Sequence, residues 1–308
     1  NVEAIGNRAF MNSRLSSATM STQTKNIGTE AFRICSSLAQ VNIPASVKVI
    51  RKNAFLGCTA VTAYNVAVGN GVYTSVNGVI YGPYNSPYDD EVASPVADKT
   101  LIQYPAGKAD SSYTVQSGTA VIGDYAFGGS KNISTVTIPS GVKKIDAYAF
   151  NESSVSQVII PSTVTSIGKQ AFGKCASLKS ITIPASVTNF DSAFYMSGIE
   201  SVTLANGVKA ISPKAFEGCK SLTSISIPSS VTSIGLASFY GCSSLGEVEI
   251  PASVTSIGNQ AFTGCTNVKL VVNWLTKLNS CLHKLTNTCL IKLSKWIVLE
   301  NLCIIVSI

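Results

Sequence analysis

Cysteine has the most regular spacing among the residues of this chain that could do chemistry. The 308 residues include nine cysteines, and six of them lie three residues after a phenylalanine: Cys35, Cys58, Cys175, Cys219, Cys242 and Cys265. The equivalent position in four other places is serine: Ser13, Ser130, Ser153 and Ser197. Exchange of cysteine with serine indicates a small buried side chain at a turn, so we interpret the thiols as a structural ladder. Occasional disulfides remain an alternative, whereas zinc binding is disfavoured because no short Cys-x-x-Cys pairs occur.

Other catalytic and metal-binding groups are sparse. His283 is the only histidine and lies outside the regular spacing, so neither a Ser-His-Asp nor a Cys-His arrangement is expected. Glu247 and Glu249, and the acidic run at 89–91, could bind a cation weakly, but solvated surface charge is the favoured interpretation. The sequence has no phosphate-binding loop and no dinucleotide fingerprint. We therefore predict that the protein is not an enzyme and uses no metal and no cofactor.

The charge balance argues against nucleic acid as a partner. The formal net charge is +7, and the last 39 residues contribute three of these charges. The remaining +4 is spread over about 270 residues, which is too diffuse for the basic surface that nucleic acid requires.

The elements that position these residues repeat along the chain. An Ala-Phe or Ser-Phe pair recurs at intervals of 22 or 23 residues, with phenylalanines at 10, 32, 55, 127, 150, 172, 194, 216, 239 and 262. One interval is 72 residues long, which is 49 more than a normal repeat and marks an insertion. A repeat of this length cannot bury its own hydrophobic face, so it is stable only when stacked on copies of itself.

Residues 162–184 show the unit most clearly. Apolar residues recur at fixed places in it, and its second half alternates apolar and polar side chains as a half-buried strand does. A proline then ends the strand because it cannot donate to a ladder. The sequence predicts a β-rich α/β repeat fold, a solenoid of about ten units at 1–272, with short parallel strands on one side and tight turns or single helical turns on the other.

The repeat Val-x-x-Ile-Gly-x-x-Ala-Phe-x-x-Cys-x-x-Leu-x-x-Ile-x-Ile-Pro resembles the BspA-like leucine-rich repeat. That family occurs in many surface proteins of bacteria and parasitic protists. Departures from the pattern are local: Leu204-Ala205 replaces Ile-Pro, and Asp191 replaces a glycine. The resemblance implies a cell-surface or secreted location and a role as a surface antigen or adhesin.

The insertion, at about 65–113, also resembles the lengthened repeats of that family, which often carry a hairpin. Asn77-Gly78 between alternating β-formers predicts a two-residue hairpin turn, and the loop 82–99 is expected to project into solvent. Seven of the eleven tyrosines fall within or beside this segment: Tyr64, Tyr73, Tyr81, Tyr84, Tyr88, Tyr104 and Tyr113. Tyrosine supplies a large contact area with few rotors, so Tyr73, Tyr81, Tyr84 and Tyr88 are predicted to contact a partner.

The outward positions of the repeated strands form the second candidate binding surface, because repeat proteins bind on extended faces. They are nearly uncharged, and the predicted contact residues are Gln40, Asn42, Thr135, Thr137, Gln157, Ser180, Thr182, Ser201, Thr203, Ser224, Ser226, Glu247 and Glu249. Serine and threonine are also ordinary exposed strand residues, which remains the alternative.

The C-terminal segment 273–308 departs from the repeat, with no glycine or proline. Four leucines and Cys289, spaced by three and four residues at 275–289, fit an amphipathic helix that caps the last repeat. An unstructured tail or an eroded continuation of the repeats is the alternative. A membrane span is disfavoured because charged residues interrupt every apolar run. At the other end, the chain enters a repeat directly, without a signal-peptide pattern, and looks like a fragment or mature segment.

Taken with the resemblance, these features favour a non-catalytic binding or adhesion protein. Its expected partner is a protein or glycoprotein of host or neighbouring cells, extracellular matrix included. An intracellular scaffold without a host ligand is the alternative, and a repeat stalk carried by an enzyme is a more remote one.

Overall fold

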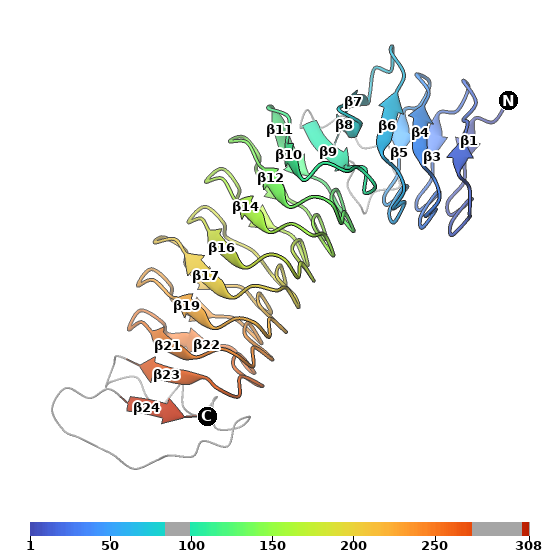
Figure 1. The fold of residues 1–308 in the computed structure, drawn as a ribbon. Coiled ribbons are helices and arrows are strands. Elements are labelled where there is room, and N and C mark those ends of the chain that lie inside the picture. The colour runs from blue at the N-terminus through green and yellow to red at the C-terminus, as the bar shows by residue number, and fades with distance from the viewer. Residues whose placement is uncertain (84–98, 273–303, 308) are drawn as a thin grey trace. The chain divides into compact units, whose positions relative to one another are not determined.

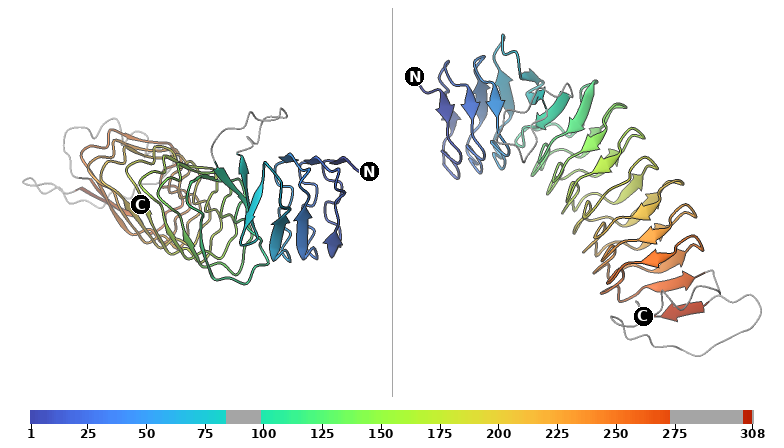
Figure 2. Two further views of the ribbon diagram at one scale, coloured as in Figure 1. Left: turned by 90° about the horizontal axis from the view of Figure 1, so that it is seen from above. Right: turned by 180° about the vertical axis from the view of Figure 1, so that it is seen from behind.

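A computed structural model of the chain describes residues 1–83, 99–272 and 304–307. They belong to two compact units, Asn1–Val155 and Ser156–Ile308, which we call the first and second units. Within each unit the chain winds into stacked coils (Figures 1 and 2), and most coils have two short strands. The predicted solenoid is thereby confirmed.

The first strand of each coil follows the alternating pattern of the repeat. In the first unit these strands are β2 (Ser17–Ala18), β4 (Gln40–Ile43), β6 (Ala63–Val66), β10 (Ser112–Thr114) and β12 (Thr135–Thr137). In the second unit they are β14 (Gln157–Ile159), β16 (Ser180–Ile183), β17 (Ser201–Leu204), β19 (Ser224–Ser226), β21 (Glu247–Ile250) and β23 (Lys269–Val272). Neighbours pair in parallel, for example β4 with β6 and β16 with β17, so equivalent residues lie side by side.

The second strand of each coil comes from the Ile-Gly part of the repeat. The first unit has β1 (Ala4–Ile5), β3 (Asn26–Ile27), β5 (Val49–Ile50), β9 (Lys99–Gln103), β11 (Thr119–Ile122) and β13 (Lys144–Ile145). The second unit has β15 (Ser166–Ile167), β18 (Ala210–Ile211), β20 (Ser233–Ile234) and β22 (Ser256–Ile257). These strands are also parallel, and most bury one isoleucine toward the core.

Turns, not helices, connect the second strand to the next first strand, and the described residues contain no helix. In the coil of Phe216, the N–H groups of Lys214, Phe216 and Gly218 donate to the next coil at 2.7–2.8 Å. The alternate N–H groups, of Ala215 and Cys219 for example, donate within the turn to the carbonyl three residues back. Every backbone donor of this segment therefore has a partner without a helix, and tight turns replace the helical turns that the sequence also allowed.

The turn also places two residues of each repeat in the left-handed backbone conformation. The residues two before and two after each repeat phenylalanine have positive φ, as Lys214 at 55° and Gly218 at 74° do. Five coils have glycine at the later position, whereas the earlier one is never glycine. A side chain in this left-handed conformation costs about 1–2 kcal/mol, so the stacking of coils must offset it.

The phenylalanines form the core of each unit. In the second unit Phe194, Phe216 and Phe239 are fully buried and stack in line, with ring centroids 5.3 and 5.6 Å apart. In the first unit Phe127 and Phe150 stack at 4.8 Å, and Phe32 stacks on Phe55 at 5.5 Å. Such offset pairs contribute about 0.5–1.5 kcal/mol each beyond the area they bury.

The predicted hairpin is present as β7 (Thr74–Val76) and β8 (Val79–Pro83), which pair antiparallel around Asn77-Gly78. Positive φ at both turn residues, 53° and 80°, is what a two-residue turn of this kind requires. Strand β8 pairs antiparallel with β9, while β9 pairs in parallel with β11. The structure therefore places a further coil, with β9 and β10, inside the segment that the sequence assigned to the insertion.

At the C-terminal end, β24 (Ile304–Ser307) pairs antiparallel with β23. The helix predicted for the capping segment falls at 275–289, which lies outside the described residues.

Candidate functional site

Within each unit, the outward side chains of the first strands lie on one side of the stacked coils, and we call this side the strand face of the unit. In the second unit, Ser180, Ser201 and Ser224 are in register, and so are Thr182, Thr203 and Ser226. All of these residues are exposed except Ser201, which is half-buried, and the residue between the two members on each strand is buried. Parallel strands lie about 4.8 Å apart, so the hydroxyl groups form two files with that repeat.

The remaining predicted residues of the second unit lie on the same face. Gln157 is exposed on β14, and Glu247 and Glu249 are exposed on β21. Beside Gln157, the apolar side chain of Ile159 has 83% of its surface exposed. The strand face of this unit is therefore mainly hydroxyl in character, with an apolar residue near one end and carboxylates near the other.

In the first unit, the strand face is an amide and hydroxyl surface. Gln40 and Asn42 are exposed on β4, and Asn65 Nδ2 donates to Asn42 Oδ1 at 3.0 Å across neighbouring coils. On β12, Thr137 is exposed and Thr135 is half-buried. All thirteen predicted strand-face residues thus keep at least part of their surface in solvent.

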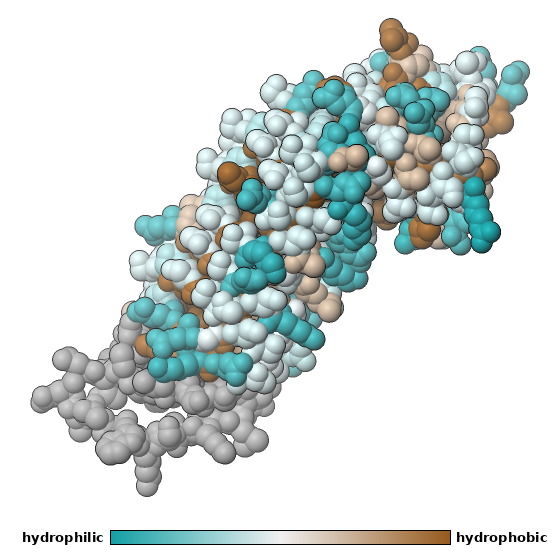
Figure 3. Space-filling view, viewed as in Figure 1, coloured by the Kyte–Doolittle hydropathy of each residue, from teal (hydrophilic) through white to brown (hydrophobic). Residues whose placement is uncertain are grey.

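Charges near the strand face of the second unit are largely paired. Lys179 Nζ lies 2.9 Å from Glu200 Oε1, and Lys269 Nζ lies 2.9 Å from Glu247 Oε2. Exposed pairs of this kind contribute little to stability, about 0–1 kcal/mol, but they remove net charge from the surface. By hydropathy, most of the surface visible in Figure 3 is of intermediate character, with separate polar and apolar patches.

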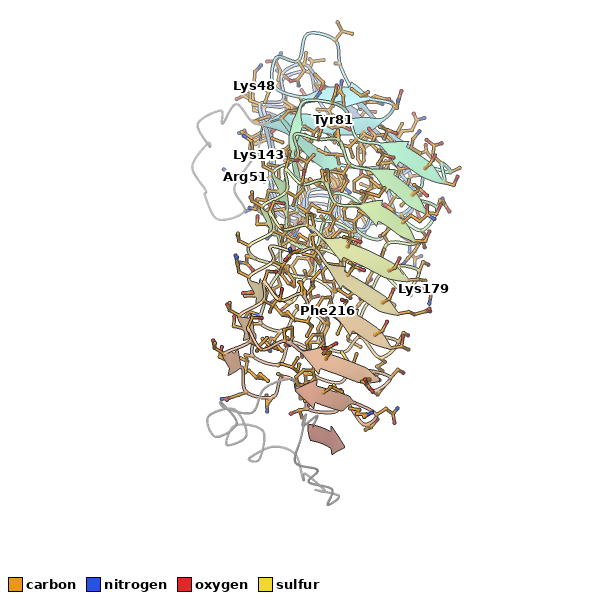
Figure 4. The ribbon with its side chains drawn as sticks, turned by 90° about the vertical axis from the view of Figure 1, so that its left-hand side faces the viewer. Lys48, Arg51, Tyr81, Lys143, Lys179 and Phe216 are labelled. Atoms are coloured by element: carbon orange, nitrogen blue, oxygen red, sulfur yellow. The ribbon has the colours of Figure 1, made fainter. Side chains whose placement is uncertain are left out.

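The prediction that Tyr73 and Tyr81 contact a partner is wrong. Their exposed fractions are 1% and 0%, because the hairpin packs inside the first unit. Tyr73 Oη accepts a hydrogen bond from Ile50 N–H at 2.8 Å, and Tyr81 Oη lies 2.7 Å from Tyr113 Oη. Figure 4 shows Tyr81 within the coil. These tyrosines fill the space beside the extra coil. The backbone satisfies the hydroxyl group of Tyr73, and Tyr113 Oη and Gln116 N–H satisfy that of Tyr81.

The other two tyrosines of that prediction, Tyr84 and Tyr88, lie outside the described residues, as does most of the loop 82–99. The cation-binding alternative for the acidic run at 89–91 falls there as well.

The cysteine ladder is structural in its geometry. All six repeat cysteines are buried and free of disulfides. The thiols of Cys58, Cys219, Cys242 and Cys265 each donate to the carbonyl oxygen of a phenylalanine 25 or 26 residues earlier, at 3.0–3.1 Å. Burial raises the pKa of Cys58 to about 12 and that of Cys219 to about 11. The thiols of Cys58 and Cys219 therefore stay protonated near neutral pH, which makes these two cysteines poor nucleophiles and poor metal ligands.

Metal-binding clusters and membrane-spanning helices were also sought among the residues that the structure describes. No three histidine, cysteine or acidic side chains are grouped there so that they could hold a metal ion. Within the same residues, no helix has the length and apolar character needed to cross a bilayer. His283 is not among them.

Sequence reasoning missed one feature, a polar hollow of the first unit that contains Asp124. The repeat spacing does indicate the coil beside this hollow, since Tyr104 lies 23 residues before Phe127. Burial raises the pKa of Asp124 to about 6, although the ammonium group of Lys52 opposes the shift.

Stacked coils of 22–23 residues with parallel strands and a phenylalanine ladder define a β-solenoid of the leucine-rich-repeat class. Six copies of the BspA type leucine-rich repeat region match residues 1–74, 108–192 and 190–302, and the chain belongs to this family. No curated protein sequence matches the chain.

Solved structures give the same fold. A leucine-rich repeat protein from Eubacterium ventriosum is 25% identical with a TM-score of 0.68, over 84% of this chain and 67% of that one. The pneumococcal vaccine antigen PcpA is 22% identical with a TM-score of 0.60, over 84% of this chain and 71% of that one.

Proposed function

We propose that this protein is a non-catalytic cell-surface or secreted binding protein whose strand face adheres to a protein or glycoprotein of host or neighbouring cells, extracellular matrix included. The observation that carries the proposal is the two files of hydroxyl groups across β16, β17 and β19, all of them exposed except half-buried Ser201. Membership in the BspA type family supports it, and so does the likeness in fold to PcpA, a pneumococcal vaccine antigen.

The chemistry of the strand face suits extended polar contact. Each hydroxyl both donates and accepts, so a partner can be matched without a fixed charge pattern. Serine and threonine have short side chains, and ordering them costs little conformational entropy compared with lysine or glutamine. The buried residues between them hold the backbone in place, so the surface is preorganised.

Size sets the expected affinity. Six first strands of the second unit, spaced by about 4.8 Å, give a face about 24 Å long, and four residues give about 13 Å of width. The product is about 300 Å², well below the roughly 800 Å² per partner of a standard interface. A partner must therefore also contact the flanking turns, or bind weakly and gain strength from several copies on a cell surface.

The test is a solid-phase binding panel with extracellular-matrix proteins and glycoproteins from cell surfaces. The strand-face variant replaces Thr182, Thr203 and Ser226 by lysine. A matched control replaces three exposed threonines near the second strands by lysine, Thr188, Thr232 and Thr255, and so carries the same added charge.

We expect wild type and the control to bind a shared ligand and the strand-face variant to lose at least tenfold in affinity. If wild type binds no better than an unrelated repeat protein, the scaffold alternative replaces adhesion. Equal binding by all three chains would move the site away from the strand face.

A further inference from the structure

Two Asn-x-Ser triplets occur in the sequence. They are Asn132-Ile133-Ser134 and Asn151-Glu152-Ser153, and the chain has no Asn-x-Thr triplet. Such a triplet, with any residue but proline in the middle, is the acceptor signal for an N-linked glycan in secreted proteins. The signal is short and also arises by chance, so the surroundings of each asparagine decide whether it can carry a sugar.

Asn132 lies at the surface, in the bend that leads into β12 (Figure 1). It is exposed, whereas the next residue, Ile133, is fully buried and anchors the bend to the core. Asn132 Nδ2 donates to Lys108 O of the preceding coil at 3.0 Å. A primary amide has two N–H groups, so one can be replaced by a bond to sugar while the other keeps this hydrogen bond. A glycan at this position is therefore compatible with the folded coil.

The surroundings of Asn132 are open. The parallel register of β10 and β12 sets Ala109, a small and exposed residue, at the equivalent place of the preceding coil. Ser134, the third residue of the triplet, is half-buried, and its hydroxyl donates to Ser111 O at 2.9 Å in a contact that faces solvent. Both groups that the signal requires thus lie at the surface of the first unit.

Asn151 is placed differently. It follows the repeat phenylalanine Phe150 and is half-buried in the turn, where its carbonyl accepts a hydrogen bond from Gly129 N–H at 2.9 Å. Ser153 has only 4% of its surface exposed and occupies the ladder position of the repeat cysteines, so its presence is explained without a glycan. A sugar on the side chain of Asn151 would have to displace part of the stacked turn.

Asn267 has the surroundings of Asn132 without the signal. It is exposed in the turn before β23, and its Nδ2 donates to Ser243 O at 2.9 Å. In both cases the acceptor is a carbonyl 24 residues earlier in the chain. The third residue after Asn267 and Val268, however, is Lys269 instead of serine. The chain thus contains two matching asparagines that differ in the hydroxyl residue of the triplet.

We propose that Asn132 is the acceptor of an N-linked glycan. In the transfer, Asn132 Nδ2 attacks the anomeric carbon of an oligosaccharide carried on a polyprenyl pyrophosphate. The new N–C bond replaces the C–O bond to the leaving polyprenyl pyrophosphate, and the amide proton passes to a base of the oligosaccharyl transferase. The modification rests on the proposed cell-surface or secreted location, because the lipid-linked donor lies in the membrane that such chains cross.

The test is secretion of the full chain, behind a cleaved leader peptide, from a eukaryotic cell line. The readouts are the mobility shift on peptide N-glycosidase treatment and glycopeptide mass spectrometry. Asn132→Gln removes the acceptor, and Ser134→Ala removes only the hydroxyl group. Asn151→Gln is the matched control at the other triplet, and Lys269→Ser creates a triplet at Asn267. Far-UV circular dichroism of each secreted variant establishes that it is folded.

We expect one glycan on wild type, at Asn132, which is lost in Asn132→Gln and Ser134→Ala and kept in Asn151→Gln. Lys269→Ser should gain a second glycan, at Asn267. The proposal is overturned if secreted wild type carries no glycan at Asn132, or if Ser134→Ala keeps it. Because the leader peptide supplies the secretory route, a missing glycan contradicts the acceptor site alone, and the binding panel tests the proposed function separately.

Discussion

Phe216 tests the phenylalanine ladder most sharply, because it is stacked on both sides. Its ring is fully buried, lies 5.3 Å from Phe194 and 5.6 Å from Phe239, and is labelled inside the coil in Figure 4. Burial of a phenylalanine contributes about 1.5–3 kcal/mol. Each of the two ring pairs adds about 0.5–1.5 kcal/mol. Replacement by alanine should therefore lower the free energy of unfolding by about 3–5 kcal/mol, in line with other large-to-small core changes.

The assay is urea unfolding of the full chain, followed by far-UV circular dichroism. Tyr240→Ala is the matched control, since this aromatic residue follows the next repeat phenylalanine and is 41% exposed. It should cost less than about 1 kcal/mol, because surface changes rarely exceed that value. A loss below about 1 kcal/mol for Phe216→Ala, with the slope of the transition unchanged, would refute the stacked core.

Three further predictions follow from the turns, the hollow and the cysteines. Ile34 is a β-branched residue at a positive φ of 61°, so Ile34→Gly should raise the urea midpoint by the equivalent of about 1 kcal/mol, whereas Ile159→Gly in an extended strand should lower it. Because the pKa of Asp124 is raised to about 6, above the usual value of about 3.9, wild type should lose stability as pH rises from 4 to 6, and Asp124→Asn should not, in urea midpoints measured across that range. Cys219→Ser should keep the thermal midpoint within a few degrees, since Ser197 occupies the equivalent position in the preceding coil, and loss of folding would show that the thiol is required.

The repeat period made the fold predictable. Phenylalanine, isoleucine and cysteine recur at 22–23 residues because each coil stacks on its neighbour in register. Equivalent positions of successive coils therefore need similar residues. Strand-face residues such as Thr182 and Thr203 followed from the same register, since alternate residues of a strand point to opposite faces.

The turns were less accessible from the sequence. Positive φ occurs at Glu30, Tyr148 and Lys214, residue types with no common preference for that conformation. The positive φ arises from hydrogen bonds between neighbouring coils. The conformational propensity of a single residue does not reflect such contacts. The sequence therefore left tight turns and helical turns both open.

The extra coil explains the error at the tyrosines. Tyr104 stands in the place of the repeat phenylalanine without the Ala-Phe pair, so the register looked interrupted over the whole interval. Counting the segment as a projecting insertion made Tyr73 and Tyr81 appear available to a partner. In the structure, Tyr73 and Tyr81 are buried beside the extra coil of Tyr104, which the repeat pattern did not reveal.

Photo-crosslinking from the strand face tests the central claim most directly. A benzoylphenylalanine at position Thr203, exposed on β17, is compared with one at Thr232, exposed beside β20, on intact cells and on matrix proteins. We predict a covalent adduct with a cell-surface or matrix component from position 203 and none from position 232. Adducts from position 232 alone, or from neither position, would contradict a binding role for the strand face.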